Sequence, residues 1–253
     1  MQNPLRHLFR CIACHDSLSD SSCLSSLCEG CQTSLIPSPP LCSMCSSVDC
    51  PSECLRPWRG TPYIDSFSAK YLMLGQGYAV LKSWKRHRGL WFDQIVLKPD
   101  ARLLQVWTEF QPDALVPIPQ RVSRAWKLGG NRAEIIAEKM SVLLRKPLLL
   151  ALSVDKKERQ GELNLNQRAE NPLHFFVTPQ GSTQLKTIQR VILVDDFKTT
   201  GSTLEKAAES LKRWGVTHIH AFTLGIRPPF LNTQSSSDLL QSTRRSISIR
   251  QDR

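Results

Sequence analysis

Residues 191–204, VILVDDFKTTGSTL, constrain the fold of this chain more than any other stretch. Four β-favouring apolar residues run into two carboxylates, Asp195 and Asp196, and a turn of small hydroxylated residues follows. A helical pattern begins at Leu204, so the string predicts a buried parallel strand, a tight turn and a helix N-terminus. Backbone N–H groups, hydroxyls and the helix dipole at such a junction bind an anion of the size of a phosphate.

The two carboxylates narrow the kind of ligand. Acids beside a phosphate-binding turn suit ribose hydroxyls and a phosphate-bound Mg²⁺ ion, which prefers oxygen ligands. A nucleoside triphosphatase is disfavoured because the chain contains no GxxxxGK[ST] sequence. The plainer alternative is an ordinary strand–turn–helix whose hydroxyl-rich turn only caps the helix.

Cysteine is the second informative residue type. All nine cysteines lie between Cys11 and Cys54. A cytosolic protein does not usually keep disulfides, so this clustering points to metal. Two CxxC knuckles supply four thiolates in the manner of a zinc ribbon, and their ligands are Cys11, Cys14, Cys28 and Cys31. A four-thiolate site has no open position for catalysis, so we expect a structural Zn²⁺ that supplies much of the folding free energy of this segment.

A second zinc site is expected further along the same segment, with a short loop between its two cysteine pairs. Its ligands would be Cys42, Cys45, Cys50 and Cys54. Crossed pairing of the knuckles and a single-zinc module with spare thiols stay open as alternatives. Cys23 is left over, and His15 is expected to be a bystander beside Cys14 rather than a ligand.

The chain is strongly basic, with a formal net charge of +11, which favours anionic partners such as phosphates or single-stranded DNA. Residues 81–88, LKSWKRHR, interleave basic side chains with Trp84, which would stack on a nucleobase. The alternative is a solvated helix face with one buried tryptophan. The first residues contain no apolar signal-peptide core and no apolar run approaches a membrane span, so we expect no membrane insertion and a cytoplasmic location.

Strand and helix patterns alternate through the rest of the chain. Strand character is found at the start of residues 63–79 and in residues 114–119, 148–154, 175–177, 191–194 and 216–226. Helical patterns run from residue 81 towards 104, from about residue 131, and over residues 204–214. Residues 178–186 are expected to be a turn-rich bridge. The alternation predicts an α/β domain with a largely parallel sheet.

Ligands bind such sheets at the carboxyl ends of the strands. Residues 120–131, the polar loop 155–171 and residues 195–203 are therefore expected to meet at one edge. We expect three parts: a zinc-ribbon module (residues 1–60), the α/β domain (residues 61–230) and a disordered basic tail (residues 231–253).

The string at residues 191–204 resembles the loop that binds 5-phosphoribosyl-1-pyrophosphate (PRPP) in type I phosphoribosyltransferases. Together with four other segments it resembles the ComF family, the ComF/GntX-like proteins in which a double zinc ribbon precedes a type I phosphoribosyltransferase-like domain. The knuckles match its N-terminus, LKSWKRHR resembles its LKxxxR stretch, and LVPIPQRVSRAWKLGGNRAEIIA resembles its VPVP…R…RGFNQ…LA segment. Gln160, Leu163, Arg168 and Asn171 fit its QxxLxxxxRxxN pattern, but residues 128–132 read LGGNR where the family has RGFNQ.

The resemblance implies PRPP binding with Mg²⁺ and a role in DNA uptake during natural transformation (competence). Its implied partners are single-stranded DNA and a helicase-like ATPase of the competence machinery. The implied PRPP-binding residues are Asp195, Asp196, Lys198, Thr199, Thr200, Gly201, Ser202 and Thr203. Candidates for binding pyrophosphate or for a hood over the site are Lys82, Arg121, Gly129, Gly130, Asn131, Gln160 and Arg168.

Two functions follow from these expectations. The first is a PRPP-binding accessory protein of DNA uptake, and the second is an active phosphoribosyltransferase that acts on an unidentified nucleobase or other acceptor. No residue set defines an acceptor or a catalytic group, and a fold does not dictate chemistry.

Overall fold

The computed structural model describes residues 10–18, 27–42, 63–86, 93, 96–98, 100–120, 130–154 and 174–227. Three predicted features lie outside these residues: the tail 231–253, the polar loop 155–171 and most of the loop 120–131. They stay predictions, as do the boundaries of the three expected parts.

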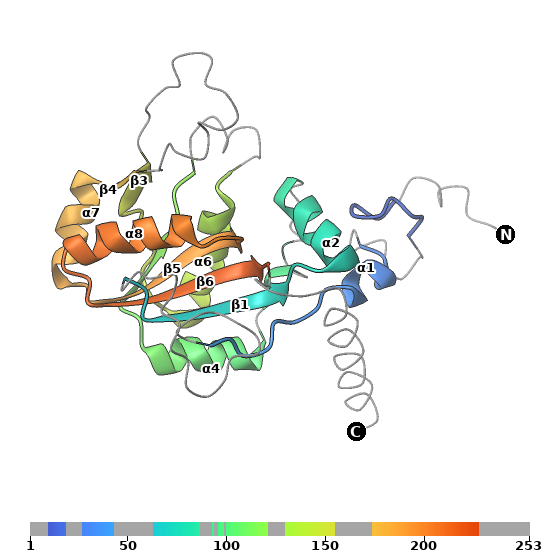
Figure 1. The fold of residues 1–253 in the computed structure, drawn as a ribbon, viewed down its shortest axis with the longest axis horizontal. Helices are drawn as coiled ribbons and strands as arrows, with labels where there is room; N and C mark the ends of the chain where they lie inside the picture. The colour runs from blue at the N-terminus through green and yellow to red at the C-terminus, as the bar shows by residue number, and fades with distance from the viewer. Residues whose placement is uncertain are drawn as a thin grey trace, which may run out of the picture.

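A four-stranded sheet forms the centre of the molecule, and all its neighbouring strands are parallel (Figure 1). Its order is β1 (Ser66–Leu72), β6 (His218–Ile226), β5 (Arg190–Lys198) and β2 (Ala114–Pro117). The two central strands pair from Arg190↔His218 to Lys198↔Ile226. Since the strands are parallel, their carboxyl ends meet at one edge, and the prediction of an α/β domain with a parallel sheet is confirmed.

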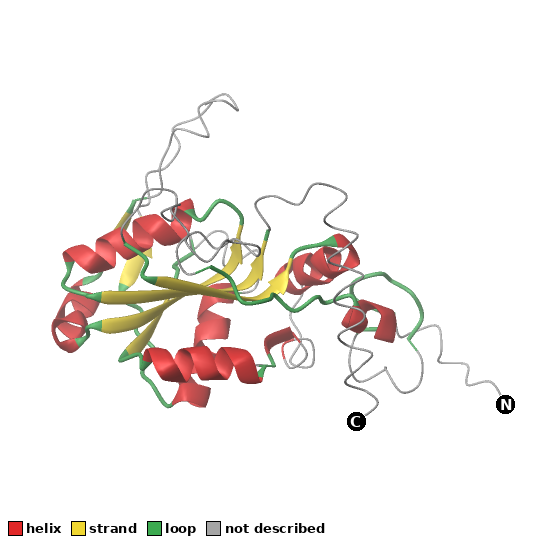
Figure 2. Cartoon of the chain, turned by 60° about the horizontal axis from the view of Figure 1, so that its bottom comes forward, coloured by secondary structure: helices red, strands yellow, loops and turns green. Residues whose placement is uncertain are grey.

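Helices cover both faces of this sheet (Figure 2). α8 (Ser202–Arg213) packs on one face, where its buried Leu204 and Leu211 share a hydrophobic cluster with Val191 and Leu193 of β5. The other face carries α2 (Gly75–Arg86), α4 (Ala101–Phe110) and α6 (Arg132–Leu144), which share a second cluster with Ile192 and Val194. Alternate residues of one strand thus enter two separate cores. None of the helices among the described residues has the length and apolar content that crossing a bilayer requires.

A small antiparallel sheet accompanies α8. It consists of β3 (Leu152–Val154) and β4 (Phe175–Val177), which are followed by α7 (Pro179–Gln184) and the 3-10 turn η2 (Leu185–Thr187). Ser210 of α8 donates a hydrogen bond to the carbonyl of Phe175 at 2.8 Å, which ties the small sheet to the helix.

The structure corrects three of the predicted elements. α2 begins at Gly75 rather than at residue 81, and α4 is a separate helix whose N-cap residue is Asp100. Of residues 148–154, only those from Leu152 onward form a strand. Leu148 makes an isolated parallel bridge to Leu115 instead. The bridge at residues 178–186 contains α7, because Thr178 caps it and Pro179 fits the first helical turn.

The N-terminal cysteine segment packs directly on α2. It contains the short helix α1 (Glu29–Thr33). A Cβ atom added to Gly77 would come within 2.3 Å of the Ser34 carbonyl oxygen, so the two backbones approach as closely as glycine allows. Ser83 of α2 donates to the carbonyl of Ile12 at 3.0 Å. α2 therefore connects the cysteine segment with the carboxyl edge of the sheet.

Candidate functional site

The turn between β5 and α8 presents free backbone donors. Gly201 is the N-cap residue of α8, with φ of 87°, and it has no side chain to accept a hydrogen bond from the first helical turn. Thr200 Oγ1 accepts a long 3.5 Å bond from the Ser202 N–H and lies 3.2 Å from the Ser202 hydroxyl, and no side chain of the N-cap residue caps the helix. Thr199, Thr200 and Ser202 are exposed. The first turn of this twelve-residue helix, with its dipole and the adjacent hydroxyls, suits an anion.

Two carboxylates lie in the last part of β5, where only Phe197 and Lys198 separate them from this turn. Asp195 is half-buried, and its Oδ1 accepts the N–H of Asp196 at 2.8 Å. Asp196 is buried, and its Oδ1 accepts the N–H of Phe197 at 2.7 Å. Each carboxylate is thus oriented by the backbone of the following residue. The structure brings the predicted acids and the predicted phosphate turn together at one strand end.

Lys85 of α2 completes this group of charges, and the sequence analysis did not single it out. Its Nζ lies 2.5 Å from Asp196 Oδ2 and 5.1 Å from the centre of the Phe197 ring. Lys82, the predicted candidate, is exposed, and its Nζ lies 6.0 Å from the Tyr78 ring. The structure explains the difference: Leu81 is buried on the inward face of α2, and Lys85 lies four residues further along that face.

Trp84 is fully buried, so the prediction that it stacks on a nucleobase is wrong and the buried-tryptophan alternative is right. Its Nε1 donates to Asp93 Oδ1 at 2.7 Å, and its ring meets Phe197 edge-on with centroids 6.4 Å apart. The guanidinium of Arg132 lies 5.1 Å from the Trp84 ring. Arg132 is also fully buried and donates from Nε to the carbonyl of Lys85 at 3.2 Å, which fixes the start of α6 against α2.

Of the pyrophosphate candidates, the structure describes Lys82, Gly130 and Asn131. Asn131 is the N-cap residue of α6: its side chain accepts the N–H of Ala133 at 3.1 Å, and its Nδ2 donates to the carbonyl of Ile118 at 2.9 Å. Gly130 has φ of 132°, a value that favours glycine. These two residues position the loop between β2 and α6. Outside the described residues lie Arg121, Gly129, Gln160 and Arg168.

Lys198, the last residue of β5, is buried at 8% exposure, and its Nζ lies 5.3 Å from the centre of the Phe67 ring. Its ammonium is thus directed over β1. Thr203 is half-buried in the first turn of α8. The binding roles of both residues stay predictions.

Four cysteines converge in the N-terminal segment. The Sγ atoms of Cys11, Cys14, Cys28 and Cys31 all lie within 4.8 Å of one another, and those of Cys14 and Cys28 are 3.6 Å apart. In a tetrahedral zinc–thiolate site with Zn–S bonds of about 2.3 Å, sulfur atoms are separated by about 3.8 Å. The cluster therefore fits a structural Zn²⁺ ion, as the sequence predicted.

The backbone around the cluster also favours thiolates. Burial raises the pKa of the Cys11 thiol, but backbone N–H groups of Cys14, Cys28 and Ala13 outweigh this and lower the pKa to about 7. Burial and the neighbouring thiols raise the pKa of Cys14 to about 11. Cys28 Sγ accepts the N–H of Cys31 at 3.4 Å, the geometry of a knuckle at a helix start. A cation bound among the four sulfurs would favour their thiolate forms and so oppose the raised pKa of Cys14.

The second predicted zinc site is described only at Cys42, which is half-buried. Cys23, Cys45, Cys50 and Cys54 lie outside the described residues. His15 is exposed and does not take part in the four-cysteine cluster, which agrees with its expected role as a bystander.

Comparison with known proteins supports this combination of parts. Residues 127–228 match a family model described as a phosphoribosyl transferase domain. Competence protein F of Haemophilus influenzae is 28% identical over 235 residues, which covers 85% of this chain and 96% of that protein. A solved purine phosphoribosyltransferase from Pyrococcus horikoshii Ot3 is 23% identical with a TM-score of 0.35 and covers 56% of this chain and 77% of that chain; this likeness is too loose to inform function.

The matched domain contains the strand end, the turn and α8, and the match to Competence protein F spans most of the chain. The four-cysteine cluster lies ahead of that domain in the sequence. The resemblance to the ComF family is therefore confirmed: the chain is similar to Competence protein F over most of its length, and a cysteine cluster precedes its match to a phosphoribosyl transferase domain.

Proposed function

We propose that this protein binds PRPP with Mg²⁺ at the edge formed by the end of β5, the start of α8 and the last turn of α2. The proposal is based on the order of functional groups along the junction between β5 and α8. Two oriented carboxylates, Asp195 and Asp196, are followed after five intervening residues by a helix start that lacks a side-chain cap. The carboxylates would bind the ribose hydroxyls of a sugar phosphate, and the helix start would bind its phosphate group.

Each part of PRPP has a partner in this arrangement. The 5-phosphate would accept hydrogen bonds from the N–H groups of the turn and the hydroxyls of Thr199, Thr200 and Ser202. Asp195, the more exposed acid, would accept hydrogen bonds from the ribose hydroxyls. Lys85, which balances Asp196 in the free protein, lies where its ammonium would also face the ligand's negative charge.

The residues also fit a magnesium ion carried in by the ligand. Mg²⁺ usually binds proteins through one or two carboxylates while substrate phosphates and waters fill its other positions. The half-buried carboxylate of Asp195 offers such an oxygen. Bound there, the ion would neutralise pyrophosphate charge and orient it.

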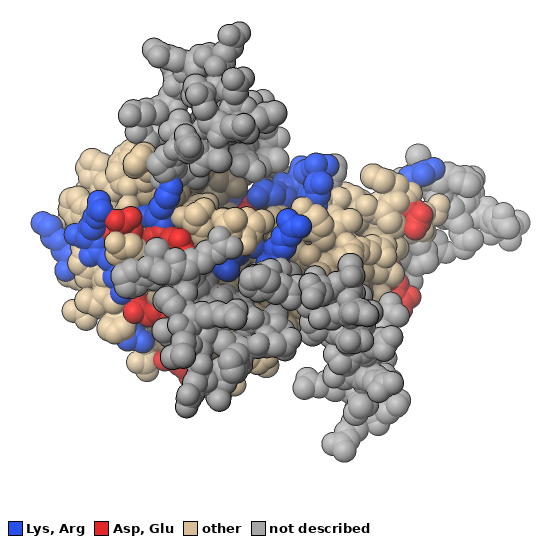
Figure 3. Space-filling model, in the orientation of Figure 1, with Lys and Arg blue, Asp and Glu red and all other residues tan. Residues whose placement is uncertain are grey.

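We further propose a cytoplasmic role in DNA uptake, since Competence protein F is similar over most of both chains. Lys82, Lys85 and Arg86 gather basic charge over α2, which Figure 3 shows as a concentration of lysine and arginine. Such a surface suits single-stranded DNA. Its affinity should fall with salt by a log–log slope of about −0.7 per neutralised phosphate. Binding that does not respond to salt, or no binding, would contradict the DNA part of the proposal.

The second candidate is phosphoribosyl transfer to an acceptor. In that reaction the bond from the ribose anomeric carbon to pyrophosphate breaks as the acceptor's nucleophile forms its own bond to the same carbon. Catalysis of this kind rests on positioning and electrostatics, so it needs no conspicuous general base. The matched phosphoribosyl transferase domain favours this candidate as much as it favours binding alone.

One experiment separates the two candidates. The protein is incubated with PRPP, Mg²⁺ and a panel of nucleobases, and pyrophosphate is measured. Release that depends on one acceptor identifies a transferase and its substrate. Saturable PRPP binding by calorimetry without release for any acceptor identifies a binding protein. No heat of PRPP binding with or without Mg²⁺ contradicts both candidates.

A role in DNA uptake is tested separately in cells. A Haemophilus influenzae strain that lacks Competence protein F is supplied with this chain or with its Asp195→Ala, Asp196→Ala variant. Recovery of transformation by the unaltered chain alone supports a role that uses the PRPP site. Equal recovery by both would uncouple DNA uptake from that site, and recovery by neither would contradict the proposed role.

A further inference from the structure

A cavity of about 250 Å³ lies on the face of the sheet that α4 and α6 cover. Its described lining comes from β1, β6, α4, α6 and the short stretch 93–98, and it includes no residue from 195–203. The cavity is therefore separate from the proposed PRPP site.

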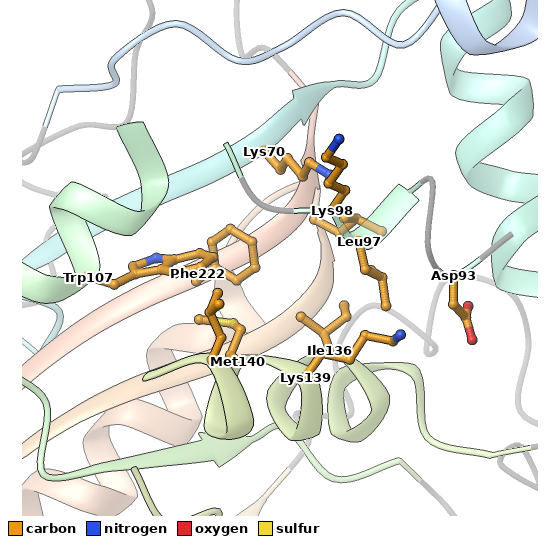
Figure 4. Close-up of a pocket in the computed structure, with 11 residues that line it drawn as sticks. Lys70, Asp93, Leu97, Lys98, Trp107, Ile136, Lys139, Met140 and Phe222 are labelled. Atoms are coloured by element: carbon orange, nitrogen blue, oxygen red, sulfur yellow. The ribbon is translucent and has the colours of Figure 1, made fainter. Parts of the chain in front are cut away.

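One end of the cavity is apolar. Trp107 of α4 and Phe222 of β6 meet edge to face, with ring centroids 4.9 Å apart and planes at 82°. Met140 of α6 lies beside them, as Figure 4 shows, and Ile136 and Leu224 are further apolar residues of the lining. Such a surface favours an aromatic or branched apolar group, since burying it removes apolar area from water and allows ring contacts.

The other end is charged, with an excess of lysine. Lys70, Lys98 and Lys139 line the cavity together with Asp93. In Figure 4 the amine of Lys139 reaches from α6 towards the side on which Asp93 stands. One oxygen of Asp93 already accepts the indole N–H of Trp84, so the single acid is partly engaged outside the cavity. The net charge facing the cavity is positive, and it is complementary to an anion.

Lys70 is an unusual residue for a sheet interior. It is 5% exposed in the middle of β1, and its Nζ donates to the carbonyl of Val96 at 2.6 Å and lies 4.6 Å from the Tyr71 ring. Burial lowers the pKa of this amine to about 7; Asp100 opposes the shift and Lys98 adds to it. Lysine is almost never buried unless it is paired. The ammonium of Lys70 has three N–H donors, and the bond to the Val96 carbonyl uses one of them, which leaves two for another acceptor.

We propose that this cavity binds a small amphipathic anion, with an aromatic or apolar ring against Trp107, Phe222 and Met140 and a carboxylate facing the lysines. A 150 Å³ apolar cavity holds one benzene ring, so about 250 Å³ suits a ligand of roughly ten non-hydrogen atoms. The apolar end supplies affinity, and the lysine end selects the charge. The proposal does not rest on PRPP binding.

Phenylacetate is a suitable probe because it has this size and charge, and phenylacetamide is its neutral isostere. Binding to the full-length, zinc-loaded protein is measured by NMR titration. We expect phenylacetate to bind at least about tenfold more tightly than phenylacetamide, the effect of a charged hydrogen bond in a partly desolvated site. Equal binding of the two compounds, or no saturable binding of phenylacetate, would overturn the proposal.

Two variants locate the binding. Met140→Trp fills the apolar end, and it should abolish phenylacetate binding while the melting temperature stays the same or rises. Lys139→Gln should weaken binding about tenfold, whereas Lys206→Gln on α8, which does not line the cavity, should leave it unchanged. If Met140→Trp does not fold, the lysine pair still decides: equal loss in Lys139→Gln and Lys206→Gln, or loss in neither, contradicts the proposed site.

Discussion

Lys85 Nζ lies 2.5 Å from Asp196 Oδ2, and this ion pair joins α2 to the strand end that precedes the phosphate turn. The acid is almost fully buried, whereas the side chain of the lysine is 21% exposed. The same helix contacts the cysteine cluster, because Gln76 Nε2 donates to Cys31 Sγ at 3.4 Å. α2 is thus the structural link between the metal cluster and the proposed ligand site.

Replacing Lys85 should destabilise the fold through Asp196. Lys85→Met leaves a buried carboxylate without its cation, which should lower the free energy of unfolding by roughly 1–3 kcal/mol. Lys82→Met makes the same chemical change one turn earlier at an exposed position and should cost little. Urea unfolding measures both. Adding Asp196→Asn to Lys85→Met should recover most of the loss; equal stability of the two lysine variants would mean that the pair contributes nothing.

The close approach of α2 to the cysteine segment should tolerate no Cβ atom at residue 77. Gly77→Ala would bring a methyl group to 2.3 Å from the Ser34 carbonyl oxygen, so the two backbones must separate at a cost of roughly 1–3 kcal/mol. Gly30→Ala is the control, because a Cβ atom there meets nothing within 4 Å. Unfolding midpoints compare the two, and a Gly77→Ala variant as stable as Gly30→Ala would show that the cysteine segment does not pack here.

Zinc should be bound by the four converging cysteines. Elemental analysis of the purified chain should find one Zn²⁺ per molecule, or two if Cys42, Cys45, Cys50 and Cys54 form the second predicted site. Cys28→Ser should remove one equivalent and lower the melting temperature, because metal binding supplies folding free energy. Cys23→Ser, which changes the cysteine left over from both predicted sites, should remove none. Absence of zinc from the unaltered protein would contradict the metal assignment.

His220 should make stability depend on pH. Burial lowers the pKa of its imidazole from 6.5 to about 4, and Ser66 and Ser68 hydroxyls lie 2.7 and 2.8 Å from its two ring nitrogens. The unfolded chain takes up this proton near pH 6.5 and the folded chain does not. Stability should therefore be lost as pH falls from about 6.5 to about 4, by up to about 1.4 kcal/mol per pH unit.

The measurement compares urea unfolding at about pH 7 and about pH 5. The loss on acidification should be smaller in His220→Asn by roughly 1–2 kcal/mol. His218→Asn, which alters an exposed imidazole on the same strand, should keep the full pH dependence. An unchanged pH dependence in His220→Asn would show that this histidine is not buried in its neutral form.

Local patterns predicted much of this architecture. The residues from Val191 through TTGST predicted the unit of β5, turn and α8. An apolar strand pattern and an amphipathic helix pattern on either side of a glycine turn leave few alternative folds for this segment. The spacing of the cysteines predicted the cluster of four, because a tetrahedral metal site needs four convergent thiolates.

Long-range contacts were beyond the sequence patterns. That Lys85 rather than Lys82 meets Asp196 depends on the rotation of α2 about its axis, which packing of Trp84 against Phe197 and Arg132 fixes. The polar and aromatic composition of LKSWKRHR suggested a nucleic-acid surface, whereas its tryptophan is a core residue. The cavity beside Lys70 also arises from packing between distant elements, and no local pattern marks it.

The most direct test of PRPP binding at the end of β5 is calorimetric titration of PRPP, in the presence of Mg²⁺, into the full-length protein and into the Asp195→Ala, Asp196→Ala variant. Glu138→Ala, which removes an exposed acid from α6, serves as the control. We expect saturable binding to the unaltered chain and to the control, and loss of measurable binding in the double variant with its circular dichroism spectrum retained. Equal PRPP affinity in all three proteins would contradict binding at this site.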